Sequence, residues 1–164
     1  MKNITDFMGL FVEQLKEQKD GERQQLEALK KLREKTTSTT LRGVIDAHIG
    51  KTKGQIERLE DVFSLLGRNI RGENNMGVGG LIEEAFELEK RCTDDDVRDA
   101  GIITSIQHLN HHNIASYGTL SIYADELEEY NVAVLLKESL EEEKQTDARL
   151  SELAEEEINL RAIQ

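Results

Sequence analysis

The 164-residue sequence contains no proline and no tryptophan, a single cysteine, and only seven Phe and Tyr residues. Because proline is the usual helix breaker, its absence favours long uninterrupted helices. No stretch alternates Val, Ile and Thr between turn residues, so no strand is predicted. Cys92 alone cannot close an internal disulfide. Residues Met1–Val12 mix Lys2 and Asp6 with apolar residues and lack the continuous apolar segment of a signal peptide. We therefore expect one all-α cytoplasmic domain over residues 1–164.

Positive charge is scarce, since 21 Lys and Arg oppose 33 Asp and Glu and leave a net charge of −12. Nucleic acid is not an expected partner, because binding phosphates needs clustered Lys and Arg. Ala100–Ala124 carries no charged residue and is long enough to span a bilayer. It also contains Gln107, Asn110 and three histidines, which are costly in hydrocarbon. We expect a helix buried within protein and no membrane span.

Apolar residues recur with a helical period in four long stretches and one short stretch. The short stretch falls between the second and third long ones, so that connection can run the length of a bundle. One such crossover is typical of ferritin-like four-helix bundles, which is the predicted fold. The predicted helices are about Ile4–Lys35, Leu41–Leu66 ending at Gly67, the short Leu81–Cys92, a third long helix from a cap at Thr93–Asp96 to about Glu128, and Val132–Leu160 after a break at Tyr130–Asn131; Arg68–Gly80 is a predicted loop.

Polar residues interrupt the apolar stripe of the long helices near their middles. Residues spaced i,i+4 share one helix face, which places two carboxylates of the last helix together. The interrupting residues are Glu22 on the first helix, Lys53 one turn after Gly50 on the second, Asn110 and Asn113 on the third long helix, and Glu143 and Asp147 on the last.

A layer of polar groups from all four helices is how bundles build metal sites, with Glu on two helices and Glu-x-x-His on the others. The alternative for any one of these residues is a place at the edge of the stripe, where it reaches water. These residues lie at similar positions along several helices, which favours one shared buried polar layer.

Four motifs also carry a family resemblance, in the same order along the chain: Gly54–Arg58 (GQIER), Gly80–Ala85 (GLIEEA), Ile114–Leu120 (IASYGTL), and Leu135–Glu138 with Glu141–Asp147 (LLKE and EEEKQTD). Over nearly its whole length the sequence resembles the YciE/YciF family of bacterial stress-associated, ferritin-like proteins. The resemblance implies a ferritin-like bundle, a homodimer and, in members with the complete ligand set, a centre for two metal ions.

The resemblance implies that this ligand set is incomplete here. Three of its seven ligands are retained, as Glu22, Glu143 and Asp147. The Glu-x-x-His of the second helix falls on Gly50 and Lys53, and two glutamates of the third long helix fall on Asn110 and Asn113. Asparagine is a weak neutral donor, and lysine brings a positive charge where the metal's charge would lie.

Charge balance leaves two functions open. Lys53 could neutralise the remaining carboxylates while Asn110 and Asn113 complete their hydrogen bonds, which predicts a non-enzymatic structural or binding protein with no catalytic residue and no cofactor. The alternative is an iron- or manganese-binding oxidase with a reduced site on Glu22, Glu143 and Asp147.

Other candidate residues give weaker signals. His108 and His112 are spaced i,i+4 and could clamp a surface metal, although partly exposed histidines are the simpler interpretation. Cys92 is expected to be inert, Glu152–Glu157 to be a solvated face, and Met76–Gly80 lacks the lysine of a phosphate loop. The uncharged third long helix predicts a homodimer, because its stripe leaves four residues on other faces without charges to solvate them: Ile102, Leu109, His112 and Ile122.

Overall fold

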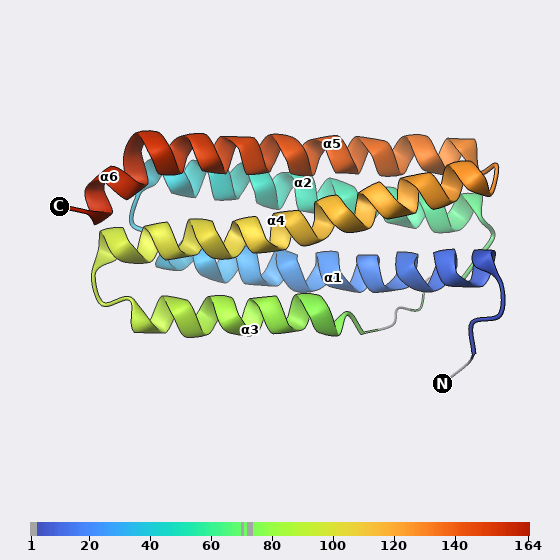
Figure 1. The fold of residues 1–164 in the computed structure, drawn as a ribbon, viewed down its shortest axis with the longest axis horizontal. Coiled ribbons are helices and arrows are strands. Elements are labelled where there is room, and N and C mark those ends of the chain that lie inside the picture. The colour runs from blue at the N-terminus through green and yellow to red at the C-terminus, as the bar shows by residue number, and fades with distance from the viewer. Residues whose placement is uncertain (1–2, 70, 72–73) are drawn as a thin grey trace.

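The structure is a computed structural model that describes residues 3–69, 71 and 74–164. Four long helices lie side by side and a shorter fifth packs outside them (Figure 1). No strand occurs in these ranges, so the predicted all-α bundle with a short connecting helix is confirmed. The elements are α1 (Phe7–Lys35), α2 (Thr39–Leu65), the shorter α3 (Met76–Arg91), α4 (Asp95–Glu126), α5 (Tyr130–Leu153), a π-helical turn (Ala154–Ile158) and α6 (Asn159–Ala162).

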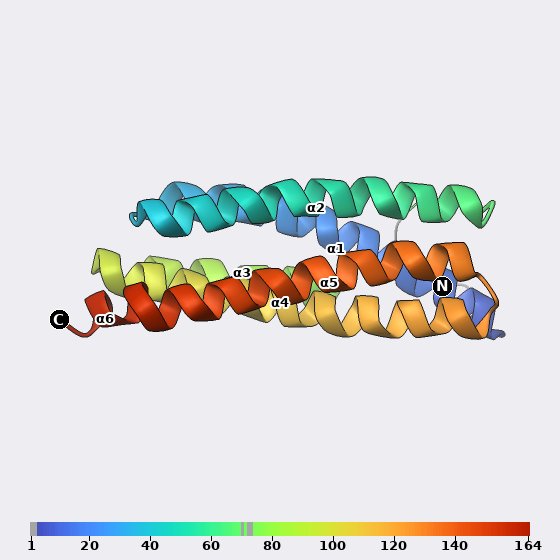
Figure 2. The same cartoon turned by 90° about the horizontal axis from the view of Figure 1, so that it is seen from above.

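The connection through α3 determines the topology. Helices α1 and α2 run in opposite directions, and α3 then carries the chain back along the outside of the bundle (Figure 1). As a result α4 runs parallel to α2, and α5 returns beside α4. Seen from above, α2 and α5 both lie on the near face (Figure 2). This is the single long crossover that the sequence predicted.

Side-chain caps set the beginnings of four helices. Asp6, Ser38, Asn75 and Asp94 each accept a hydrogen bond from a main-chain N–H three residues later, at 2.7 to 3.2 Å. Such caps satisfy N–H groups that have no partner within the helix. The Asn75 cap starts α3 at Met76, so the glycine-rich residues 76–80 form its first turn rather than a loop.

Two turns differ in how well the sequence predicted them. Gly67 ends α2 as expected: its φ is +58°, and the N–H of Arg68 donates to the Phe63 carbonyl at 3.1 Å. The break before α5 lies at residues 127–129, earlier than predicted, and Glu128 adopts a φ of 59° without being glycine. Of the predicted loop 68–80, residues 70, 72 and 73 lie outside the described residues.

The apolar core consists of two separate clusters. One surrounds Phe11, Phe63 and Tyr117, and the other surrounds Leu29 and Ile103. On each long helix, polar buried residues stand between the positions that contribute to the two clusters. The middle of the bundle is therefore polar, as the interrupted stripes predicted.

Packing within the chain explains much of the uncharged helix. Ile102 and Leu109 are only 1% exposed within the single chain, and α3 packs against α4. They therefore need no second molecule to cover them, contrary to the expectation from the sequence, whereas Ile122 is 59% exposed. Among the described residues, no helix combines the length and the apolar character that a membrane crossing requires.

Asp99 on α4 holds the turn between α1 and α2. Its buried carboxylate accepts hydrogen bonds from the Ser38 N–H at 2.7 Å and from the Thr37 N–H and hydroxyl at 3.0 and 2.8 Å. We expect Asp99→Ala to lower the free energy of unfolding by about 2–4 kcal/mol, because it leaves buried donors without partners. Urea denaturation measures this. The exposed Asp61 provides the control, and an equal loss in Asp61→Ala would contradict the explanation.

Candidate functional site

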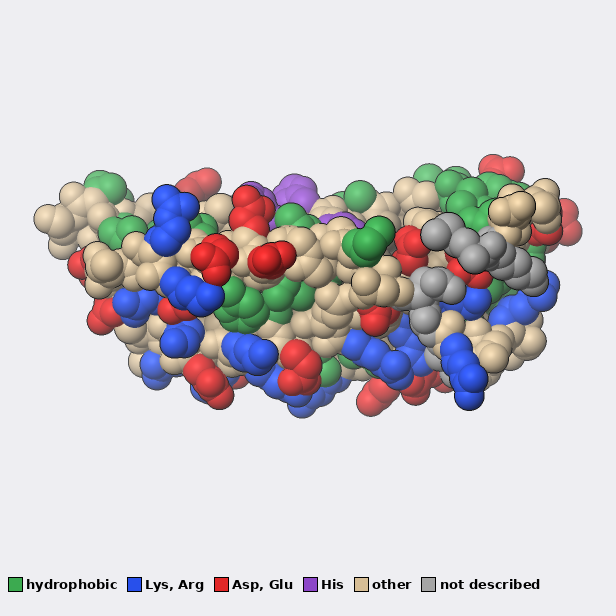
Figure 3. All heavy atoms as spheres, turned by 90° about the horizontal axis from the view of Figure 1, so that it is seen from below, with side chains coloured by type: hydrophobic (Ala, Val, Ile, Leu, Met, Phe, Trp, Pro, Cys, Tyr) green, Lys and Arg blue, Asp and Glu red, His purple; other side chains and the backbone are tan. Residues whose placement is uncertain are grey.

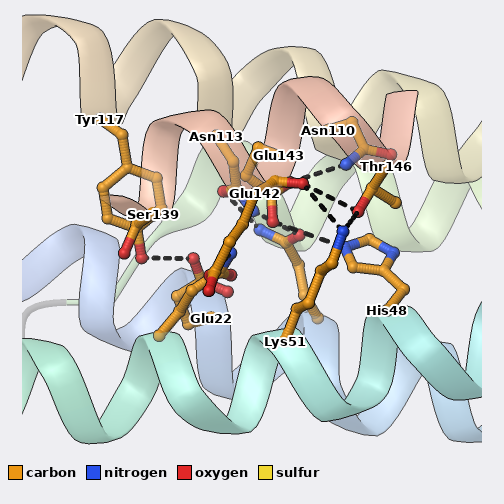
Figure 4. A network of polar contacts seen from close by, with 12 residues as sticks. Glu22, His48, Lys51, Asn110, Asn113, Tyr117, Ser139, Glu142, Glu143 and Thr146 are labelled. Atoms are coloured by element: carbon orange, nitrogen blue, oxygen red, sulfur yellow. Dashed lines mark hydrogen bonds and ion pairs between the residues drawn. The ribbon is translucent and has the colours of Figure 1, made fainter. Parts of the chain in front are cut away.

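A layer of buried polar side chains crosses the middle of the bundle (Figure 4). All four long helices contribute to it, and each contributes at the height where its apolar residues stop. Its members are at most 4% exposed: Gln18, Glu22 and Gln25 from α1, His48, Thr52 and Gln55 from α2, Asn110 and Asn113 from α4, and Ser139, Glu143 and Thr146 from α5. The expected shared layer is therefore present.

Glu22 is held by neutral donors. One of its carboxylate oxygens, Oε1, accepts a 2.6 Å hydrogen bond from the Tyr117 hydroxyl and a 3.2 Å bond from the Gln18 amide. Complete burial, and next the nearby charge of Glu143, raise the pKa of Glu22 to about 8, although these two hydrogen bonds act in the opposite direction. Glu22 is therefore largely protonated at neutral pH.

Glu143 lies in a different environment. Asn110 donates to its Oε2 at 2.7 Å, and His48 Nε2 lies 3.6 Å from its Oε1, which is an ion-pair distance rather than a hydrogen bond. Burial is the largest single influence and raises the pKa of Glu143. His48, with Gln55 and Asn110, outweighs burial and lowers that pKa below its ordinary value. The layer thus pairs a protonated carboxyl with an ionised one.

Amide groups connect the two sides of the layer. Asn113 and Gln25 exchange two hydrogen bonds, at 2.8 and 3.0 Å, and Gln18 also donates to Asn113 at 3.1 Å. These bonds join α1 to α4 through groups that would be costly to bury unpaired. Asn110 and Asn113 both face inward, as predicted.

The predicted site residues do not all lie in the layer. Glu22 and Glu143 are fully buried in the layer, whereas Asp147 lies at its edge, 21% exposed, bonded to Gln107 and His111. Gly50 and Lys53 are exposed. The expectation that Lys53 neutralises the layer is therefore wrong.

The error on α2 has a simple cause. The prediction followed the isoleucines, but Ile49 and Ile56 are only half-buried and flank the true inward stripe. That stripe runs from Ile45 through His48, Thr52 and Gln55 to Leu59, with uninterrupted spacings of three and four residues. On α5 the same shift of one position puts Thr146 in the layer instead of Asp147. Continuing the spacing through polar residues would have found both.

The remaining candidates lie away from the layer. His108 and His111 are exposed and His112 is half-buried, while Cys92 is a free, half-buried thiol at the end of α3. Histidine side chains are visible at the surface near the middle of the molecule (Figure 3). Glu155 and Glu156 are exposed, as expected for a solvated face.

Comparisons with known proteins agree with this architecture. Residues 6–163 match the family described as a domain of unknown function, DUF892. The chain belongs to this family. Protein YciF of Escherichia coli K12 is 40% identical over 163 residues, which cover 99% of this chain and 96% of the relative.

Two solved structures share the fold. The E. coli stress protein YciF superposes with a TM-score of 0.91 at 38% identity, covering 95% of this chain and 99% of that one. YcfI of Rhodopseudomonas palustris gives a TM-score of 0.89 at 35% identity, covering 92% and 96%. The resemblance found in the sequence motifs is confirmed.

The layer does not fit a two-metal centre. Bundles hold two ions with a Glu on two helices and an i,i+3 Glu-x-x-His pair on each of the others. Four i,i+3 pairs face inward here: Glu22 with Gln25, Thr52 with Gln55, Asn110 with Asn113, and Glu143 with Thr146. Glu22 and Glu143 are ligands of the right type, but none of the four pairs combines Glu with His. Among the described residues, no three His, Cys, Asp or Glu side chains converge as a metal ion would need.

Replacing Glu22 by Gln tests its protonation. Its pKa is raised, so the folded chain holds a proton that the unfolded chain releases above about pH 4.5, and stability falls as the pH rises toward 8. Glu22→Gln should remove this fall, which is several kcal/mol at about 1.4 kcal/mol per pKa unit. The pKa of Glu143 is lowered, so this group changes the free energy of unfolding only at acidic pH, below the range over which Glu22 acts.

Urea denaturation between pH 5 and pH 9 measures the effect. Glu84→Gln is the matched control because Glu84 is exposed. An unchanged pH dependence in Glu22→Gln would show that the Glu22 carboxyl is ionised in the folded protein.

The exposed Lys53 gives a second test. We expect Lys53→Met to change the free energy of unfolding by less than about 0.5 kcal/mol, as is usual for surface positions. Thermal denaturation checks this. A decrease of several kcal/mol in the free energy of unfolding would show that the Lys53 side chain is buried in the polar layer after all.

Proposed function

We propose that this chain is a non-enzymatic, stress-associated member of its family, in which a hydrogen-bonded polar layer stands in place of a metal centre. The observation that carries the proposal is that one oxygen of each glutamate in the layer accepts hydrogen bonds from protein donors. Tyr117 and Gln18 bind Glu22, and Asn110 binds Glu143. The part in stress is proposed because the E. coli relative is described as a stress protein.

Charge supports this proposal. Two divalent ions bring four positive charges, and the layer offers two carboxylates, Glu22 and Glu143. His48 already faces Glu143. An additional pair of cations would therefore meet too little negative charge to offset the loss of their hydration.

A single iron or manganese ion is the second candidate. Glu22 Oε2, Glu143 Oε1 and Asn110 Oδ1 are buried and have no hydrogen-bond partner among the described residues. Buried oxygens without a donor are costly, and a cation or a water molecule satisfies them. Asp147, predicted as a further ligand, lies at the edge of the layer.

Metal analysis separates the two candidates. The protein is purified without chelator, incubated with Fe²⁺ or Mn²⁺, and desalted. We expect it to retain less than roughly 0.1 equivalent of metal per chain, because the layer lacks the ligand set of a bundle metal site. Elemental analysis by mass spectrometry is the measurement. One equivalent that disappears in Glu143→Gln would favour the single-ion site, and two equivalents would overturn the proposal.

A gain-of-function variant provides the positive arm. Thr52→Glu, Gln55→His, Asn113→Glu and Thr146→His together introduce the ligand types of a two-metal bundle at buried, inward positions. This variant should retain metal where the unaltered chain does not. Gly50→Glu with Lys53→His is the matched control, since both positions are exposed and should add no tightly held metal.

We also propose that the chain is a cytoplasmic homodimer. Ile122 before the α4–α5 turn and Tyr130 and Val134 after it are 59 to 64% exposed. Hydrophobic side chains also gather at the end of the molecule that holds this turn (Figure 3). Exposed apolar groups of this kind favour association.

Sedimentation equilibrium at micromolar concentration tests the dimer. We expect twice the 18.6 kDa chain mass for the unaltered protein and a shift to monomer in Ile122→Asp with Val134→Asp. A monomeric unaltered chain would contradict this proposal.

A further inference from the structure

A groove of about 340 Å³ opens between α2 and α5, directly beside the polar layer. Gly43 and Ala47 leave room in its wall, and a Cβ added at Gly43 would meet no atom within 4 Å. Lys51 and Arg149 bring two positive charges to the lining, which contains no Asp or Glu among the described residues. Acidic residues make up 33 of 164 in the chain, so this lining has the opposite charge to the protein as a whole.

Lys51 supplies the first of these charges. Its half-buried ammonium donates to the Thr146 hydroxyl at 3.2 Å and to the Glu142 carbonyl at 3.5 Å, both neutral oxygens. Within the part of the chain that the structure describes, no carboxylate lies within ion-pair distance of it. An ammonium has three donors, so Lys51 keeps both charge and hydrogen-bonding capacity for a ligand.

His48 provides the second observation. The side chain is 1% exposed and lines the groove, and its Nε2 lies 3.6 Å from Glu143 Oε1. Neither ring nitrogen has a hydrogen-bond partner among the described residues. Figure 4 shows His48, Lys51 and Thr146 together on one side of Glu143. A buried ring N–H without a hydrogen-bond partner is costly, and a ligand that accepts a hydrogen bond from the imidazole would remove that cost.

Arg149 completes the lining. Among the described residues it forms one ion pair, with Glu152 on the same helix, and both side chains are about half exposed. Exposed pairs of this kind contribute little to stability, so the guanidinium can turn to a ligand without much loss.

We propose that this groove binds a small oxyanion, a phosphate or carboxylate group held by Lys51 and His48, with Arg149 at the mouth. A cation is disfavoured there by the two positive charges, and an apolar ligand would leave the Lys51 charge without a counter-ion. The oxyanion is the ligand class that both groups can bind, through charge-assisted hydrogen bonds. The proposal does not depend on whether the layer holds metal.

Inorganic phosphate and acetate are the two probes. Each is titrated into the full-length protein at constant ionic strength while the His48 ring resonances are followed by NMR and the heat is measured by calorimetry. We expect saturable binding that shifts the His48 signals, and Lys51→Gln should weaken it about tenfold or more, as expected for loss of a charged hydrogen bond. The stronger probe identifies the group.

Lys53→Gln is the matched control, because it removes the same charge from an exposed position two residues away. It should bind the probe as the unaltered chain does. Equal weakening in both variants would show non-specific charge attraction and overturn the proposal. The absence of saturable binding by either probe, or binding that leaves the His48 signals unmoved, would overturn it as well.

Discussion

The hydrogen bond from the Tyr117 hydroxyl to Glu22, at 2.6 Å, joins the apolar core to the polar layer. Tyr117 packs its ring into one apolar cluster and directs its hydroxyl into the layer. Burial raises the pKa of the Tyr117 hydroxyl well above its ordinary value, as does the adjacent Glu22. The hydroxyl therefore stays a donor, and Glu22 can be buried only because such a donor meets it.

Burying so many polar groups lowers the stability of the protein relative to one with an entirely apolar core. In return, the exchanged amide bonds of Gln25 and Asn113 fix the register of α1 against α4, since a shift of one residue would leave both amides unpaired. Asp99 fixes the bundle end in the same way. The groove on the α2–α5 side is different, because Lys51 and His48 there keep unused hydrogen-bonding capacity.

The sequence predicted the fold because cap residues and apolar spacing act locally, and the four long helices lie where these signals placed them. It also predicted Glu22, Glu143, Asn110 and Asn113 in the layer. On α2 it failed, because His48, Thr52 and Gln55 have polar side chains that are normally solvated, and only tertiary pairing reveals that they are buried. The turn at Glu128 was misplaced because no glycine marks its positive φ.

The central claim is that the polar layer holds no metal. Anomalous diffraction data collected at the iron absorption edge, from crystals soaked with Fe²⁺, test it most directly. The account predicts no anomalous peak in the layer, and ordered water bound to the free oxygens of Glu22, Glu143 and Asn110. Two anomalous peaks between Glu22 and Glu143, with the Tyr117 hydroxyl displaced from its carboxylate, would contradict it.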